Sequence, residues 1–263
     1  MRESIRKGPG KATIGAVVAL AVVLTACAGN RAVGVESVPV DGPENGTEPT
    51  PEHSFAQKEL VDGTNSTSRS PIGQFDFKNY SYPLPRGWHD SDSREITLTD
   101  GKRRTTEQKI GMEFLTTKFF DLTQNGEDEA AVILQIRTGG SAVPQIVYIF
   151  EWREGAPNLI WYFRTGDRAD GGLKKIYAED NALIVELFGR DRYIFGQMET
   201  LKITGDEFQL CCPTHFTKTR YVRSGRSFSI DGDRMTHSIA DPSAEPVRNM
   251  GDLALKEERE SEQ

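Results

Sequence analysis

Residues 146 to 163 decide the fold: Ile146-Val-Tyr-Ile-Phe-Glu-Trp152, a turn over residues 153–158, then Leu159-Ile-Trp-Tyr-Phe163. Both arms are rich in β-branched and aromatic residues, which favour strands, and the residues between them favour a turn. Alternate residues of a strand point to the same face, so we expect the aromatic rings of each arm to pack together on a sheet. A sugar-binding platform is the alternative use of these rings. The stretch predicts an antiparallel hairpin.

Strand-like segments recur along the chain at intervals of about 10–15 residues, with Asp-Gly, Asn-Gly and Ser-Gly turn signals among them. They cover residues 96–98, 112–120, 130–136, 173–178, 182–188, 198–203, 208–210, 216–222 and 228–230. Only Gln135 interrupts the apolar run at 130–136, which is typical of a strand covered on both faces. The sequence therefore predicts a mainly β fold of antiparallel sheets from successive hairpins. A sandwich, a barrel and a partial propeller all fit this pattern.

The β domain is predicted to cover residues 72–235. Residues 28–71 are rich in Gly, Pro, Ser, Thr, Asn and Glu and poor in large apolar residues. Such a composition cannot build a core, so residues 27–71 are expected to form a disordered tether, apart from a short helix at 54–61. A coil of this length spans roughly 35–40 Å. Residues 236–263 are expected to be a polar tail that is disordered or loosely docked.

The first 27 residues carry the clearest functional signal. A basic start is followed by an apolar run over residues 12–26, short for a membrane span, which ends in Leu24-Thr25-Ala26-Cys27. This motif resembles the lipobox of bacterial lipoproteins, and the chain is similar to uncharacterised members of that class. The resemblance implies a signal peptide over residues 1–26, cleavage before Cys27, lipid on the Cys27 sulfur and acylation of its new N-terminus. An uncleaved anchor helix or a signal peptide cleaved elsewhere are the alternatives.

The same resemblance implies a location in the bacterial cell envelope, on the outer membrane facing the periplasm or on the outer face of the plasma membrane. Acyl chains on Cys27 would hold the protein to the membrane stably. The net charge is −7, of which residues 1–26 contribute +3, so the mature chain carries −10. This charge argues against binding to nucleic acid, which needs a basic face. The expected partners are the membrane, through the lipid on Cys27, and an envelope protein.

The loop Asp121-Leu-Thr-Gln-Asn-Gly-Glu-Asp-Glu129 is the first candidate binding site. Alternating oxygen-bearing side chains followed by glycine suit a hard cation such as Ca²⁺. The stretch resembles the hairpin loop of FG-GAP and VCBS-type β repeats, whose loops often bind Ca²⁺. The ligands implied are Asp121, Thr123, Asn125, Asp128 and Glu129. A solvated hairpin turn is the alternative.

A second candidate is Gly166-Asp-Arg-Ala-Asp-Gly-Gly172, in which two acids and three glycines suit either a cation site or a wide hairpin. A third is Cys211-Cys-Pro-Thr-His215. Adjacent cysteines in an oxidising compartment form a strained disulfide, remain two packed thiols, or bridge between molecules. With His215 they also suit a soft metal or a redox role.

The basic residues Lys218, Arg220, Arg223 and Arg226 indicate either an anion-binding patch or a hairpin with local ion pairs. Enzyme signatures are lacking: the chain has no nucleophile elbow, phosphate-binding glycine loop or zinc-protease helix. The sequence therefore favours a lipid-anchored envelope protein that presents a non-catalytic β-rich binding or assembly module. An envelope hydrolase using carboxylates, or a redox or metal-handling role at Cys211, Cys212 and His215, are the alternatives.

Overall fold

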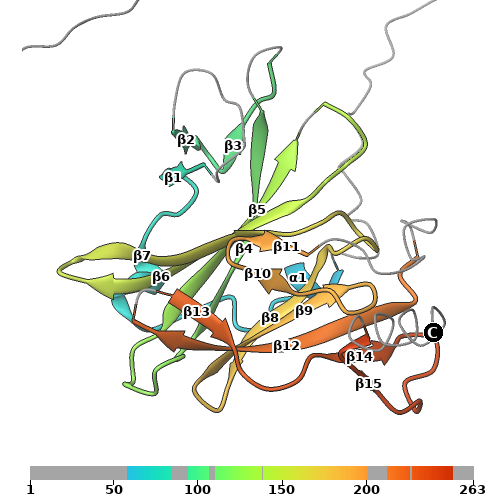
Figure 1. Cartoon of the computed structure of the whole chain (residues 1–263). Coiled ribbons are helices and arrows are strands. Elements are labelled where there is room, and N and C mark those ends of the chain that lie inside the picture. The colour runs from blue at the N-terminus through green and yellow to red at the C-terminus, as the bar shows by residue number, and fades with distance from the viewer. Residues whose placement is uncertain are drawn as a thin grey trace, which may run out of the picture. The chain divides into compact units, whose positions relative to one another are not determined.

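The computed structural model describes residues 58–84, 94–106, 110–137, 139–200, 212–225 and 227–250. In these residues the chain is mainly β, and nearly all strands pair antiparallel as successive hairpins, which confirms the predicted fold class (Figure 1). No helix in the described ranges has the length and apolar character needed to cross a membrane.

The first sheet has seven strands in the order β10-β11-β7-β6-β5-β4-β3. Their bounds are β3 Lys102–Arg103, β4 Gly111–Phe120, β5 Glu129–Arg137, β6 Gln145–Arg153, β7 Ala156–Arg164, β10 Ile194–Phe195 and β11 Met198–Glu199. From β3 to β7 each strand pairs with the next along the chain. The hairpin of β10 and β11 then adds to β7 through a parallel contact between Met198 and Arg164.

The second sheet has six strands in the order β15-β14-β12-β9-β8, with β13 also paired to β12. Their bounds are β8 Leu173–Glu179, β9 Ala182–Phe188, β12 His215–Ser224, β13 Ser227–Ile230, β14 Met235–Ser238 and β15 Val247–Arg248. Strands β13 and β14 pair with successive halves of β12. The strand expected at 208–210 and the second half of the one expected at 198–203 lie outside the described residues.

An apolar core joins the two sheets. Alternate residues of β5, Ala131 and Ile133, share this core with Leu183, Val185 and Leu187 of β9. Figure 1 shows β8, β9 and β12 (yellow to orange) crossing the long strands β4 to β7. The sheets are open at their edges in the described residues, so of the three architectures left open by the sequence the sandwich is the one observed.

A second core covers the other face of the first sheet. It is closed by the 3₁₀ helix η2 (Pro71–Gln74) and the small sheet of β1 (Ser81–Pro83) and β2 (Glu95–Thr97). The remaining residues of β5, among them Val132 and Leu134, point into this core. Strand β5 is therefore buried on both faces, as its unbroken apolar sequence predicts.

The aromatic residues of β6 and β7 divide between the two cores. Tyr148 and Phe150 lie in the core beneath β1 and β2, whereas Trp161 and Phe163 lie between the sheets. The predicted packing of these rings on sheet faces is confirmed, although two faces are used instead of one.

Two hairpins owe their tight turns to residues with positive φ. Glu154 and Gly155 have φ of 54° and 84° between β6 and β7, and Asp180 and Asn181 have φ of 48° and 59° between β8 and β9. Positive φ at both central positions is typical of a type I′ turn, whose twist matches that of the flanking strands.

The folded part begins earlier than the sequence predicts. Helix α1 (Lys58–Val61) places Leu60 in the core between the sheets, and the amide of Phe119 donates to the carbonyl of Asn65 at 2.7 Å. Residues 58–71 therefore belong to the domain and not to the tether. The pattern missed them because Leu60 and Val61 are the only large apolar residues in this polar segment.

The folded part also ends later than residue 235. Strand β14 pairs with β12, and β15 pairs with β14 through Met235 and Thr236. Thr236 is buried, so part of the expected polar tail is a sheet edge. Residues 251–263 lie outside the described residues.

Candidate functional site

An open cleft of about 530 Å³ lies beside the ends of β7 and β11. Four separate stretches of chain line it, with Ala142, Pro144, Arg164, Gly166, Asp167, Asp170, Arg192, Glu199 and Thr200. Small-molecule sites commonly have about 300–1,000 Å³. The cleft has that size, and its lining is rich in charged groups of both signs.

Arg192 is the fixed centre of this lining, and its side chain is 3% exposed. Its guanidinium donates to Glu199 Oε1 at 2.7 Å, to the carbonyl of Thr200 at 3.0 Å, and to Asp170 Oδ1. Its backbone amide donates to Thr217 Oγ1 at 2.9 Å. Arg192 therefore ties the β7–β8 loop, β11 and β12 together around one buried positive charge.

Glu199 is the carboxyl group with unused hydrogen-bonding capacity. Its side chain is 13% exposed, and within the described residues it accepts one hydrogen bond, from Arg192 to Oε1. Burial raises its pKa from 4.5 to about 7, although Arg192 opposes this shift. A carboxyl group that titrates near neutral pH in a cleft is a candidate for ligand binding or proton transfer.

The glycines of the 166–172 loop make room for these groups. Gly171 has φ of 79°, and a Cβ there would lie 2.6 Å from Cδ of Glu199. A Cβ on Gly166 would lie 1.9 Å from the carbonyl oxygen of Asp170. Both distances are far below van der Waals contact, so the glycines allow the loop to close against β11.

The two acids of the same loop face arginines. Asp170 pairs with Arg192, and Asp167 pairs with Arg168 at 3.0 Å while accepting the amide of Val143. Asp167 and Asp170 also exchange backbone hydrogen bonds of 2.9 and 2.8 Å. This geometry is that of a hairpin turn whose carboxylates are matched by guanidinium groups.

Arg164 supplies the second positive charge of the cleft. It ends β7, beside Met198 of β11. Burial lowers the pKa of its guanidinium, and the charge of Glu199 opposes this shift. Sequence reasoning singled out neither Arg164, Arg192 nor Glu199, and only the glycine-rich loop pointed to their neighbourhood.

Stability should depend on pH through Glu199. Because its pKa is raised on folding from 4.5 to about 7, the folded state holds an extra proton between these values. This group therefore stabilises the fold as pH falls through that range, by up to about 3 kcal/mol. We expect Glu199→Gln to remove this contribution from urea unfolding compared at pH 5 and pH 8. The exposed Glu127→Gln is the control, and an unchanged pH dependence in Glu199→Gln would contradict the assignment.

The loop predicted to bind Ca²⁺ forms a hydrogen-bonded turn. Asp121 accepts the amides of Asn125 and Gly126 at 3.1 and 2.8 Å, and buried Glu129 accepts the amide of Leu122 at 2.7 Å. Burial raises the pKa of Glu129.

The other predicted ligands of this loop lie at its surface. Asp128 accepts the hydroxyl of Ser68, and Thr123 is exposed. In the described ranges no group of three or more His, Cys, Asp or Glu is arranged to hold a metal ion. The turn accounts for these residues without a cation, and Ca²⁺ binding stays a prediction.

The cysteine motif is only partly described. Cys212 is exposed, whereas Cys211 lies outside the described residues, as does Cys27. Nδ1 of His215 lies 2.8 Å from Thr214 Oγ1 and 3.3 Å from Nε of Arg190. The disulfide, metal and redox interpretations stay predictions.

The basic hairpin forms ion pairs instead of an open anion patch. The pairs are Lys218–Glu179, Arg220–Asp231 and Arg223–Glu151, at 2.7–2.9 Å. Arg226 lies outside the described residues. The pair of Arg223 with Glu151 joins β12 to β6, so it connects the two sheets.

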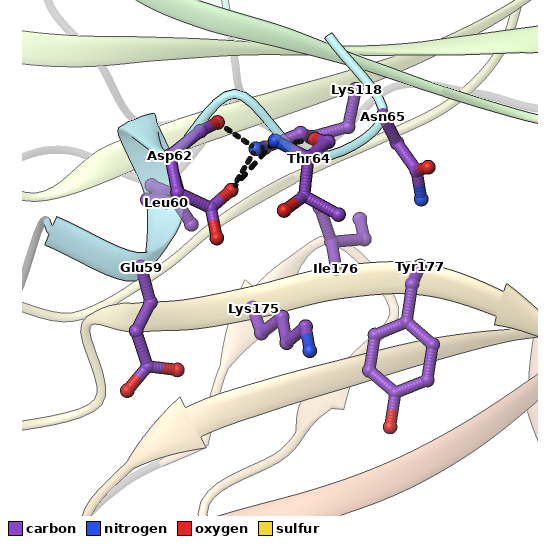
Figure 2. A pocket seen from close by; sticks show the side chains of 9 residues that line it. All are labelled: Glu59, Leu60, Asp62, Thr64, Asn65, Lys118, Lys175, Ile176 and Tyr177. Carbon is purple, nitrogen blue, oxygen red and sulfur yellow. Dashed lines mark hydrogen bonds and ion pairs between the residues drawn. The ribbon is translucent and has the colours of Figure 1, made fainter.

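A second, much smaller cavity of about 20 Å³ lies beside Lys118 of β4 (Figure 2). Lys118 is buried, and its Nζ donates to Asp62 O, Asp62 Oδ1 and Thr64 O at 2.7–2.8 Å. An ammonium group has three donors, and all three are used here. The cavity has room for about one water molecule. Lys118 therefore fastens the segment after α1 to β4 and is not a reactive amine.

Comparison with known proteins assigns the chain to no family. No protein-family model matches the chain, and no curated protein or solved structure matches it at a significant level.

Proposed function

We propose that this chain is a lipid-anchored protein of the bacterial envelope whose β domain is a non-catalytic binding or assembly module. The main support for this proposal is the apolar run that ends in Leu24-Thr25-Ala26-Cys27 and is followed by a polar stretch. Lipid on Cys27 would be the contact with the membrane. An envelope protein or a small ligand would be the partner.

The pairing of buried charges supports a binding module. Buried Lys118, Glu186, Asp191 and Arg192 all take part in ion pairs or hydrogen bonds within the domain. Charges fixed in this way hold loops in place and are not free to act as nucleophiles. The domain therefore offers a rigid, preorganised surface, and preorganisation reduces the entropic cost of binding.

Anchoring is tested by replacing Cys27 with serine and following fatty-acid incorporation and membrane fractionation. We expect the unaltered chain to take up labelled fatty acid and to sediment with membranes. Cys27→Ser should lose the label and leave the membrane fraction. Cys212→Ser, which keeps the lipobox, is the matched control. A Cys27→Ser protein that retains label and membrane association refutes the proposal.

One observation favours an envelope hydrolase as the second candidate. Glu199, with a pKa of about 7, and Asp170 bind the same guanidinium in one cleft. A carboxylic acid beside a second carboxylate is the pair that glycoside hydrolysis uses. The hydrolase interpretation predicts that Glu199→Gln abolishes turnover while leaving substrate binding intact, whereas a binding module has no turnover to lose.

A further inference from the structure

We propose that the β10–β11 hairpin docks on the lipid surface to which the chain is anchored, with Phe195 and Met198 inserted into the bilayer interface. The inference rests on the proposed lipid anchor at Cys27. It adds a contact between the folded domain and the membrane, and it names the two side chains that make this contact.

Phe195 and Met198, here called the apolar pair, are exposed on the same face of the hairpin. Phe195 is 77% exposed and Met198 is 51% exposed. The two residues pair across the hairpin, on either side of the turn at residues 196–197. Paired residues stand on one face of a sheet, with Cβ atoms about 4.5–5.5 Å apart. Strand β10 is the outermost strand of the first sheet. The apolar pair is therefore one projection at the edge of that sheet.

Buried groups hold this hairpin in place. The amide of Ile194 donates to the hydroxyl of Tyr221 at 2.6 Å, and Ile194 itself lies in the core between the sheets. On the other side of the apolar pair, Trp161 Nε1 donates to the carbonyl of Gly196 at 3.1 Å. The exposure of the apolar pair is therefore a property of the folded hairpin and not of a loosely held loop.

The apolar pair is too small to be the core of a protein interface. A stable interface buries about 800 Å² of each partner around an apolar centre. Two side chains of this size expose no more than roughly 300 Å². In the part of the chain that the structure describes, the one other exposed large apolar side chain is Val247, which belongs to β15 of the second sheet. Insertion into a bilayer has no such threshold, because it strengthens with each apolar side chain buried. The pair therefore fits a lipid surface better than a second copy of this chain.

The chain before the domain would bring the apolar pair to the membrane. Thirty residues, 28–57, separate Cys27 from Lys58 at the start of α1, and they span at most about 100 Å. Lipid on Cys27 would keep the hairpin within that distance of the bilayer, at an effective concentration on the order of 1 mM. A contact too weak to recruit a free domain is formed under this condition. Charge would not recruit the domain to anionic lipid, because the mature chain carries −10.

The test places a fluorescent reporter at each of two positions in the full-length chain extracted from membranes. Phe195→Trp and Val247→Trp are reconstituted into vesicles of phosphatidylcholine with brominated acyl chains, which quench tryptophan on contact. The signal of the unaltered protein, with its three tryptophans, is subtracted. Relative to unbrominated vesicles, we expect the reporter at position 195 to lose at least half of its fluorescence and the reporter at 247 less than a tenth. Adding Met198→Gln to Phe195→Trp should remove most of the quenching.

Flotation of the same vesicles separates this inference from the anchor. Protein that floats but is quenched equally at positions 195 and 247 overturns the docking and keeps the anchor. Protein that does not float is titrated with brominated vesicles up to about 10 mM lipid. Quenching at 195 alone would then keep the docking without the anchor, and no quenching would overturn both. A reporter at 195 that is blue-shifted with rising protein concentration, yet unquenched by lipid, would show that a second copy covers the apolar pair, and it also overturns the inference.

Discussion

Replacing Phe150 with alanine is expected to lower the free energy of unfolding by about 3–5 kcal/mol, because the truncation leaves a cavity in a packed core. Phe150 is fully buried in β6. Its ring centroid lies 5.3 Å from that of Phe77 and 5.7 Å from that of Tyr80, both in the layer over the first sheet. The loss of stability therefore measures how much the packing of residues 71–84 on the first sheet contributes to the free energy of unfolding. Urea unfolding followed by tryptophan fluorescence is the measurement.

The control for this change is Phe195→Ala. Phe195 is 77% exposed at the β10–β11 hairpin, so its removal should alter stability by no more than about 0.5 kcal/mol. Equal effects of the two substitutions would contradict the arrangement of three layers, which are the second sheet, the first sheet, and the layer of η2, β1 and β2 that covers the first sheet. A small effect at both sites would show that the layer of η2, β1 and β2 does not pack on the first sheet.

Replacing Arg192 with methionine is the second change with a large expected effect, again about 3–5 kcal/mol. The substitution removes one partner of a buried ionic cluster and leaves two carboxylates without their cation. It should also raise the pKa of Glu199 further, because Arg192 opposes the effect of burial more strongly than Arg164, the other arginine that lowers this pKa. Unfolding in urea at pH 5 and at pH 8 separates the two effects, since the loss should be larger at pH 8.

Arg153→Met is the matched control for Arg192→Met. Arg153 pairs with Glu154 at 3.5 Å, and both side chains are exposed. Exposed pairs contribute about 0–1 kcal/mol, so this variant should unfold almost like the unaltered protein. If Arg192→Met matched it, the cluster would not be holding β11 and the β7–β8 loop together.

The strands could be predicted because their local signals and their burial agree. The apolar run at 130–136 became a strand buried on both faces, and residues 182–188 became β9 with the same bounds. The layer over the first sheet could not be predicted in this way. It consists of short segments without a sustained periodic apolar pattern. Their apolar side chains, such as Ile72 and Ile96, are buried only because they pack on the first sheet.

The boundaries of the domain predicted from the sequence differ from the observed ones for a related reason. Lys118 interrupts an apolar strand and resembles a surface lysine in sequence, yet it is buried because acceptors from residues 62 and 64 surround it. No periodicity in residues 58–71 signals that contact. Tertiary hydrogen bonds therefore decide where this domain begins.

The cleft was only partly accessible to sequence reasoning. The glycines indicated the 166–172 loop as a candidate, but Arg192 and Glu199 lie 20 and 27 residues beyond Gly172 and reach the loop only through the order of strands in the sheet. Charged residues make up 27% of the chain, so residue type alone could not identify Arg192 and Glu199 as members of a site. In the Asp121–Glu129 loop, by contrast, the carboxylates of Asp121 and Glu129 accept backbone amides of the loop itself, and Ca²⁺ binding there stays a prediction.

The most direct test of the account is the mass of the N-terminal tryptic peptide of the membrane-extracted protein. Trypsin cuts after Arg31, so the account predicts a peptide of residues 27–31 that begins at Cys27 and carries lipid on its sulfur and an acyl chain on its amine. An unmodified peptide running from residue 12 to residue 31, or a mature chain that begins at any other residue, would contradict it.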